Sequence, residues 1–232
     1  VVDEAYYALD QELRKPGGGD EAKIEELKAA LKAAQDAADE YVVANEFGEI
    51  IDRAGGVGLN AFTNTDSTGY MFSLPANKVE LWAYLESERF LDPVFRQFYL
   101  ERDVVQEERR MRTDSQPIGR LIEQFTSISF EAHPYKQPVV GYMSDLKSFT
   151  REDANDFYAK HYVPGNMTIA MVGDIKAEEV LPIVRKYFDR LPAGKKPEPL
   201  RTVEPPSKTE KTVVMPDPSQ PVYVEGYHRP AA

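Results

Sequence analysis

The stretch Glu101-Arg-Asp-Val-Val-Gln-Glu-Glu-Arg-Arg-Met-Arg112 has the periodicity of a helix, with Val104, Val105 and Met111 on an apolar side. Glu101 and Glu108 are seven residues apart, so they project from nearly the same side of that helix, two turns apart. Taken alone, a charged run of this kind is typical of a solvated helix in which Glu and Arg pair at i,i+4. The segments on either side of it favour a second interpretation.

Three glycines lie upstream, in Ala54-Gly-Gly-Val-Gly-Leu-Asn-Ala-Phe-Thr63. Their spacing is neither GxxxxGK[ST] nor GxGxxG, so nucleotide binding is rejected. The glycines instead predict a turn that leads into a strand over residues 57–63. A turn at Asn64–Ser67 then leads to a second strand over residues 68–74, which Pro75 ends.

The first 46 residues predict a helical hairpin. Apolar side chains recur at helical spacing on either side of Pro16-Gly-Gly-Gly19, a segment that no helix would contain. Asp20 is a suitable N-cap for the second helix. We interpret residues 1–46 as a structural excursion with a narrow apolar seam rather than as a functional site.

The remaining elements follow from periodicity and from the residues that break it. Further helices are expected over residues 79–90, 118–128, 150–162 and 177–191, further strands over 167–172, 210–215 and 221–228, and a proline-rich linker over 192–209. The first of these strands is expected to be buried. Because helices and strands interleave without regular βαβ units, the expected fold class is α+β, with a mixed or antiparallel sheet packed with helices.

Composition limits the class of protein. Hydrophobic residues make up 42% of the chain and aromatic residues 11%, so it can bury a normal core. Residues 1–50 hold 13 acidic and 5 basic side chains, a local charge of −8 out of −11 for the chain, and this acidity argues against nucleic acid as a partner. Cysteine is absent, which excludes disulfides and thiolate metal ligands. No apolar run approaches the length of a membrane span.

From residue 47 onward, the order of seven motifs resembles the M16 family of zinc metallopeptidases, which includes pitrilysin, insulin-degrading enzyme and mitochondrial processing peptidase. The motifs are Gly-Gly-x-Gly-x-Asn-Ala-Phe-Thr at 55–63, Leu-Pro-x-Asn at 74–77, Glu-Arg-Phe at 88–90, Glu-Arg-Asp-Val-Val-x-Glu-Glu at 101–108, His-Pro-Tyr and Pro-Val-x-Gly within 133–141, Tyr-x-Pro-x-Asn-Met at 162–167 and Val-Gly-Asp-Ile at 172–175. No single motif is decisive, but seven in this order are specific.

The resemblance implies a division of the chain into four segments. They are a helical-hairpin insertion of the kind found in some bacterial members over 1–46, a partial N-terminal M16 peptidase domain over 47–191, the linker over 192–209, and the truncated start of a second M16 domain over 210–232. Both ends are expected to be cut, since the chain opens without Met in a helical pattern and stops inside an expected strand.

The resemblance also implies a chemistry. In the family, two His of an inverted His-x-x-Glu-His motif and a Glu from a later helix hold Zn²⁺, and the Glu of the motif acts as base on a zinc-bound water. The later Glu corresponds to Glu108, and Glu101 to an acid that supports a ligand His. Asn60, Ala61 and Phe62 fall on the strand that pairs with extended peptide substrate in the family.

The histidines of that motif are not in this sequence. His133, His161 and His228 are each followed by residues that do not match His-x-x-Glu-His, and each is interpreted as a loop or packing residue. The motif helix is expected just upstream of Val1, so the 232-residue chain is expected to be inactive by itself.

Two hypotheses of different class follow from the resemblance. One is part of an active zinc metalloendopeptidase; the other is a non-catalytic structural or partner subunit of a heterodimeric peptidase. The expected partners are peptide substrates, the remainder of the peptidase (the motif helix and second domain) and another subunit in a homo- or heterodimer. The resemblance to bacterial members with such an insertion favours a periplasmic or cell-envelope location.

Overall fold

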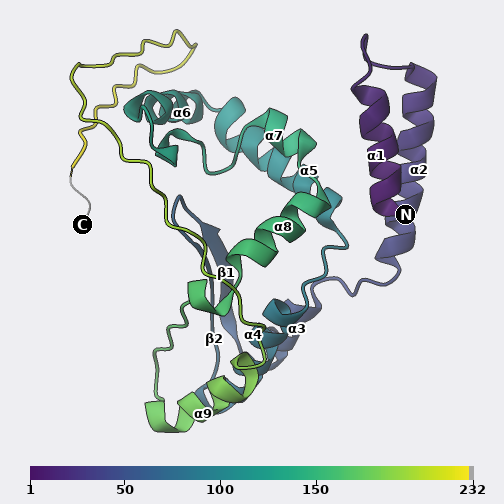
Figure 1. The fold of residues 1–232 in the computed structure, drawn as a ribbon, viewed down its shortest axis with the longest axis vertical. Coiled ribbons are helices and arrows are strands. Elements are labelled where there is room, and N and C mark those ends of the chain that lie inside the picture. The colour runs from purple at the N-terminus through teal and green to yellow at the C-terminus, as the bar shows by residue number, and fades with distance from the viewer. Residues whose placement is uncertain (230–232) are drawn as a thin grey trace. The chain divides into compact units, whose positions relative to one another are not determined.

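The computed structural model describes residues 1–229, which form two compact units (Figure 1). Unit 1 comprises residues 1–60, 71–99 and 151–196, and unit 2 comprises residues 61–70, 100–150 and the segment from 197 onward. Helices with a small two-stranded antiparallel sheet make up the described residues, so the predicted α+β class is confirmed. The predicted division into four segments stays a prediction.

Three elements have residues in both units. The strands β1 (Val57–Thr63) and β2 (Thr68–Ser73) form the sheet, and α5 (Phe98–Arg109) carries the acidic pair. The turn between the strands is closed by Asn64, whose side-chain Oδ1 accepts hydrogen bonds from the backbone N–H groups of Asp66 and Ser67, both at 2.8 Å. Such Asx turns explain why Asn is favoured at this position. The predicted hairpin of strands is therefore confirmed nearly to the residue.

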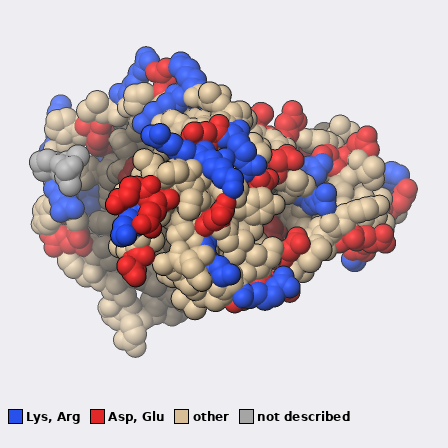
Figure 2. All heavy atoms as spheres, turned by 90° about the horizontal axis from the view of Figure 1, so that it is seen from below, with Lys and Arg blue, Asp and Glu red and all other residues tan. Residues whose placement is uncertain are grey.

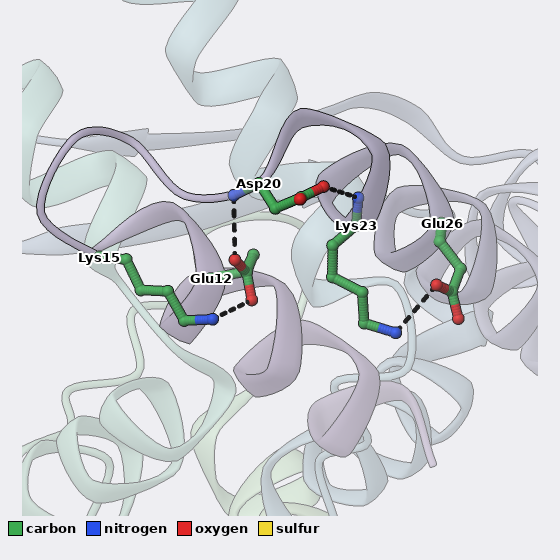
Figure 3. Close-up of polar contacts among 5 residues, drawn as sticks. All are labelled: Glu12, Lys15, Asp20, Lys23 and Glu26. Carbon is green, nitrogen blue, oxygen red and sulfur yellow. Dashed lines mark hydrogen bonds and ion pairs between the residues drawn. The ribbon is translucent and has the colours of Figure 1, made fainter.

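Unit 1 begins with the predicted helical hairpin, α1 (Val2–Leu13) and α2 (Glu21–Asp39). Between the helices, Gly17, Gly18 and Gly19 have φ values of 90°, 91° and 76°, a conformation that side chains with a Cβ disfavour. The buried Glu12 carboxylate accepts from the backbone N–H of Asp20 (3.1 Å) and from Lys15 Nζ (2.6 Å), as Figure 3 shows. These bonds lower the pKa of Glu12, with the Lys15 bond as the largest cause.

The second helix starts as predicted, because Asp20 Oδ1 accepts a hydrogen bond from the Lys23 N–H at 2.9 Å (Figure 3). Exposed ion pairs such as Lys23–Glu26 and Lys32–Asp36 cover the outer face of the helix. On the face of the molecule seen in Figure 2, acidic and basic side chains are likewise interspersed. Exposed pairs of this kind contribute little to stability, because solvent screens the two charges.

The first helix packs through a small aromatic cluster. The Tyr6 ring stacks on Tyr99 with centroids 4.3 Å apart, and the two residues are 5% and 3% exposed. The Tyr99 hydroxyl donates to Asp3 Oδ1 at 3.1 Å, and the other oxygen of Asp3 pairs with Arg151. Burial, with the nearby Asp3 charge, raises the pKa of Tyr99 well above its usual value. Thus the hairpin is docked on the first turn of α5 within unit 1.

The remaining helices of unit 1 include one that was not predicted from periodicity. They are α3 (Glu46–Arg53), α4 (Val79–Leu91), α8 (Arg151–His161) and α9 (Ala177–Phe188). The unpredicted helix is α3, whose Phe47, Ile50 and Ile51 have the i, i+3, i+4 spacing of a helical face, although the helix is only eight residues long. Trp82 of α4 stacks on Phe188 of α9 with centroids 5.6 Å apart, which joins the two helices.

Gly56, at the end of α3, is expected to tolerate no side chain. A Cβ there would overlap Ile51 Cγ2 and lie 3.1 Å from Leu74 Cδ2, and Ile51 is fully buried. Overpacking of this kind costs about 1–3 kcal/mol, so Gly56→Ala should lower the free energy of unfolding by that amount in chemical denaturation. The control is Gly173→Ala, where a Cβ would meet nothing within 4 Å. Equal effects of the two changes would contradict the packing described here.

Three predicted strands are not formed in the described part of the chain. Residues 167–172, 210–215 and 221–228 have no strand hydrogen bonding, and Val172 is fully exposed rather than buried. These segments do contain the apolar residues typical of strands. A strand also needs a neighbouring strand to pair with its backbone N–H and C=O groups. The described sheet holds β1 and β2 and provides no such neighbour for these segments.

Unit 2 is built around α6 (Pro117–Ser129), with the short α7 (Met143–Ser148), a second helix that was not predicted from the sequence. Pro117 occupies the first turn of α6, where a missing N–H costs nothing. The segment after residue 196 is held to this helix and to the loop that follows it. Lys211 Nζ donates to the carbonyl of Ile128 at 3.1 Å, and Arg120 of α6 pairs with Asp217.

The strongest attachment of that segment is Glu204. Its carboxylate accepts three backbone N–H bonds, from Glu131 (2.6 Å), Ala132 (3.0 Å) and His133 (2.7 Å). These bonds, the one from Glu131 first, lower the pKa of Glu204 from its ordinary value of 4.5 to about 2, and the charge of His228 adds to the effect. A carboxylate that accepts several backbone N–H bonds is the usual setting for so low a value.

This attachment predicts a defined pH dependence. Because the folded pKa is depressed, Glu204 stabilises the fold fully above pH 4.5, and the contribution is lost as the pH falls toward 2. In chemical denaturation, the free energy of unfolding of the wild type should therefore exceed that of Glu204→Gln by a constant amount near neutral pH. This difference in free energy should shrink between pH 4.5 and 2. The control Glu210→Gln, an exposed carboxylate of the same segment, should show no such convergence. A difference that stays constant down to pH 2 would contradict this role of Glu204.

Candidate functional site

Helix α5 carries the two acids predicted to belong to the site. Glu101 and Glu108 lie on nearly the same side of the helix, about 10 Å apart along its axis. The Glu101 side chain is exposed. That of Glu108 is 40% exposed, and its Oε1 lies 2.7 Å from Arg112 Nη1. Both carboxylates can therefore reach solvent and can serve as oxygen donors.

The buried side of α5 differs from the one that the sequence predicted. Of the predicted apolar side, Val104 and Met111 are 54% and 64% exposed and Val105 is partly buried. After Tyr99, the buried positions are Gln106 and Arg109, at 8% and 6%. Periodicity failed here because it assumes that apolar side chains face inward. After Tyr99 in the first turn, the buried positions of this helix are polar, and they are stabilised by hydrogen bonds.

Arg109 has the most contacts among these inward side chains. Its guanidinium binds both carboxylate oxygens of Glu123 on α6, at 2.8 and 3.0 Å. Nη1 also donates to the carbonyl of Gly141 at 2.7 Å, and Asp114 Oδ1 lies 3.3 Å from Nη2. Gly141 has a φ of 82°, the left-handed conformation that glycine adopts without strain. The Glu123 bond raises the pKa of Arg109, so the charge is permanent.

Arg102 has a similar place one residue after Glu101. Its side chain is 11% exposed, and Nη1 donates to the carbonyls of Lys147 (3.3 Å) and Phe149 (3.1 Å) at the end of α7. From the sequence, no role in the site was predicted for Arg102 or Arg109. The signal was present as the dipeptide Glu-Arg at 101–102 and again at 108–109, which places the two basic residues at the same seven-residue interval as the acids.

A π-helical turn over Arg110–Asp114 follows α5, with the Ser115 N–H bonded to the Arg110 carbonyl at 2.8 Å. This i→i+5 bond widens the helix by one residue directly after Glu108 and Arg109. Such turns are rare and occur often at functional sites.

The residues predicted to pair with substrate all lie on β1. Asn60, Ala61 and Phe62 are exposed there. Phe62 packs over Gly69 of β2, since a Cβ at Gly69 would overlap the Phe62 ring. In the described residues β1 has β2 as its one strand neighbour.

Each of the three histidines packs against an aromatic ring, as expected for packing residues. His133 Nδ1 accepts from the Tyr135 N–H at 3.3 Å, and its ring lies 4.3 Å from that of Tyr135. His228 stacks on Phe130 with centroids 4.9 Å apart. His161 stacks on Phe157 at 4.3 Å.

Among residues 1–229, no three His, Asp or Glu side chains converge in a way that could hold a metal ion. Glu108 is suited to act as a single oxygen donor, and its partner Arg112 is exposed and exchangeable. No helix in the described part of the chain has the length and apolar character needed to cross a membrane.

Comparison with known proteins places these features in one family. Residues 148–232 match the model of a domain described as "Peptidase M16 inactive domain". The zinc protease PqqE of Helicobacter pylori is 35% identical over 150 residues, which are 64% of this chain and 34% of that protein. An uncharacterized zinc protease of Mycobacterium leprae is 34% identical over 161 residues, 68% of this chain and 36% of the relative.

Two solved structures of proteases are similar to this chain. The crystal structure of a protease from Helicobacter pylori is 33% identical with a TM-score of 0.65, over 71% of this chain and 41% of that one. The first half of the periplasmic protease PqqL of Escherichia coli, at 22% identity and a TM-score of 0.59 over 73% of this chain and 38% of that one, shares the fold.

The fold of the described residues is thus similar to that of M16 protease halves. The chain belongs to the M16 peptidase family. It spans about a third of the length of the two curated relatives named above.

The relatives are named zinc proteases, and zinc in proteins is usually held by four N, S or O ligands. Of such donors the described residues offer Glu108 as one fitting carboxylate, while the three imidazoles are packed against aromatic rings elsewhere. The described residues therefore do not make a complete zinc site, and Glu108 as one ligand of such a site stays a prediction.

Proposed function

We propose that this chain is part of a zinc-dependent metalloendopeptidase that hydrolyses peptides bound in extended form, with Glu108 as the third protein ligand of zinc. The observation that carries the proposal is the half-exposed Glu108 carboxylate on α5, two turns after Glu101, in a chain whose relatives are named zinc proteases. The other two ligands and the general base would come from a His-x-x-Glu-His helix outside these 232 residues. Residues 1–232 alone are then inactive.

In this proposal Glu101 acts through a neighbour rather than on the metal. Its exposed carboxylate would accept a hydrogen bond from a ligand imidazole and so fix the tautomer and orientation of that ring. Asn60, Ala61 and Phe62 would pair with the backbone of an extended peptide by strand addition. Backbone pairing of this kind tolerates many side-chain sequences, because the hydrogen-bonding groups are common to all residues.

One observation favours a second candidate function, that of a non-catalytic partner subunit. The family model matched by residues 148–232 is described as an inactive domain. Glu101 and Glu108 lie before that range, and a subunit without catalytic activity has no chemical need for two acids on one helix face. We therefore favour the peptidase.

The location is proposed on a separate ground. The structural relative from Escherichia coli is a periplasmic protease, and it shares the fold of this chain over 73% of the length. We propose a periplasmic or cell-envelope location for the present protein too.

The test is made on the full-length protein that contains this chain. Wild type should hold zinc and hydrolyse an unfolded peptide, and Glu108→Gln should lose both. Zinc content is measured by atomic absorption after dialysis, and hydrolysis with a fluorogenic peptide. A wild-type protein that binds zinc weakly and cleaves no peptide would instead favour the partner subunit.

A further inference from the structure

The acids of α5 are each followed by an arginine, and the structure separates the two pairs by environment. Arg102 and Arg109 are directed into unit 2, at 11% side-chain and 6% residue exposure. Glu101 is exposed and Glu108 is 40% exposed. Consecutive residues on a helix point about 100° apart, and residues seven apart point nearly the same way. The helix therefore has an inward arginine stripe beside an outward acidic stripe.

The partners of the arginines are fixed groups. At the end of α5, Arg109 holds Glu123 through two parallel hydrogen bonds and donates a third to the carbonyl of Gly141. Near the start, Arg102 donates to the carbonyls of Lys147 and Phe149. Paired N–H donors with charged acceptors have strict geometry and are about twice as strong as neutral hydrogen bonds. The paired bonds to Glu123 thus hold Arg109 in orientation as well as in position, and two bonds from Nη1 of Arg102 to backbone carbonyls hold the other end of the helix.

Two such anchors constrain a helix more than one does. A helix held at one point can still turn about its axis or pivot around that point. Arg102 and Arg109 are about 10 Å apart along the axis, so a turn of α5 would break the contacts at both ends. The other arginines of the stretch do not contribute, because Arg110 and Arg112 pair at the surface with Glu107 and Glu108.

We infer that Arg102 and Arg109 are positioning residues that set the rotation of α5 and thereby the direction in which Glu101 and Glu108 project. Neither arginine would touch metal or peptide. The inference rests on the proposed function for its chemical consequence, and on the contacts within unit 2 for its geometry.

The experiment has a structural arm that needs no zinc. Because the 232-residue chain contains no cysteine, nitroxide labels can be placed by Glu108→Cys and by Gln124→Cys, an exposed position on α6. In the full-length protein without other cysteines, pulsed EPR gives the distance distribution between the labels. Adding Arg109→Lys or Arg102→Lys should broaden this distance distribution, because lysine keeps the charge but lacks the planar guanidinium group with its several N–H donors. Adding Arg110→Lys, the matched surface control, should leave it unchanged.

The functional arm uses the same arginine variants without labels. Arg109→Lys and Arg102→Lys should each weaken zinc binding on the order of 10-fold, the lower end of the effect of groups that orient metal ligands. The loss of hydrolysis should appear in kcat calculated per mole of folded protein, with KM for the peptide unchanged, whereas simple loss of folded protein would leave both of these constants unaltered. Circular dichroism confirms that each variant is folded.

The two arms separate the inference from the proposed function. Broadening together with weaker zinc binding supports the inference. An unchanged distance distribution overturns it, and so does broadening with normal zinc affinity in a protein in which Glu108→Gln loses zinc. If Glu108→Gln itself binds zinc normally, the proposed function fails, and the EPR result still decides whether the arginines orient α5.

Discussion

Replacing Glu108 by glutamine is expected to remove peptide hydrolysis from the full-length protein and to weaken zinc binding by more than about 100-fold. Groups that only orient metal ligands account for roughly 10–100-fold, so loss of a ligand should exceed that range. Glutamine keeps the size of the side chain and removes the charge that favours binding of a dication. The change also removes the ion pair with Arg112, but exposed pairs contribute only about 0–1 kcal/mol. The fold should therefore survive.

Glu107→Gln is the matched control for this change. Glu107 precedes Glu108 on the same helix and pairs with Arg110 at the surface, so its replacement removes a similar ion pair while leaving the proposed ligand intact. It should retain zinc and activity. The zinc affinity of Glu101→Gln should lie between those of Glu107→Gln and Glu108→Gln, about 10–100-fold below that of the wild type. Normal zinc content and hydrolysis in Glu108→Gln would show that the ligand assignment is wrong.

The largest expected loss of stability follows from Tyr99→Ala in unit 1. Tyr99 is 3% exposed, stacks on Tyr6 and donates a hydrogen bond to Asp3. Truncation of a large buried aromatic side chain costs about 3–5 kcal/mol, because packing is lost and a cavity remains. Here the cavity would lie between the helical hairpin and the first turn of α5. Chemical denaturation should show this loss as a lower midpoint.

Two further variants separate the contributions at this position. Tyr99→Phe keeps the stacked ring and removes the hydroxyl, so it should cost only about 1 kcal/mol, the usual value of one hydrogen bond. Tyr41→Ala truncates a ring that is 74% exposed and should change the free energy of unfolding by less than about 0.5 kcal/mol. If Tyr99→Ala were no more destabilising than Tyr41→Ala, the hairpin would not be docked through this cluster.

Docking of the hairpin also refines how residues 1–46 are understood. The sequence predicted an excursion with its own apolar seam, and the seam exists. Part of it, however, is used outside the hairpin, because Tyr6 and Asp3 of α1 contact Tyr99 and Arg151. Within unit 1, the excursion therefore packs against the residues where α5 begins.

Local pattern was enough for most elements of the fold. Both helices of the hairpin, the two paired strands and α4, α5, α6, α8 and α9 were predicted, because periodicity, caps and breakers act within a few residues of each other. It was also enough to single out Glu101 and Glu108, through their spacing and the motifs around them. The short helices α3 and α7 escaped because each spans little more than two turns or fewer, too short for a period to be convincing.

What the sequence by itself determined is thus the fold class, the helix that carries the acids, and the family resemblance. Tertiary structure alone decided which side of that helix is buried. Val104 and Met111 are apolar yet exposed, while Arg109 is charged yet buried, because Glu123 and the Gly141 carbonyl lie within hydrogen-bonding distance of its guanidinium. It also decided that residues 167–172 form no strand. Both outcomes depend on partners distant in the chain, and a local pattern contains no information about them.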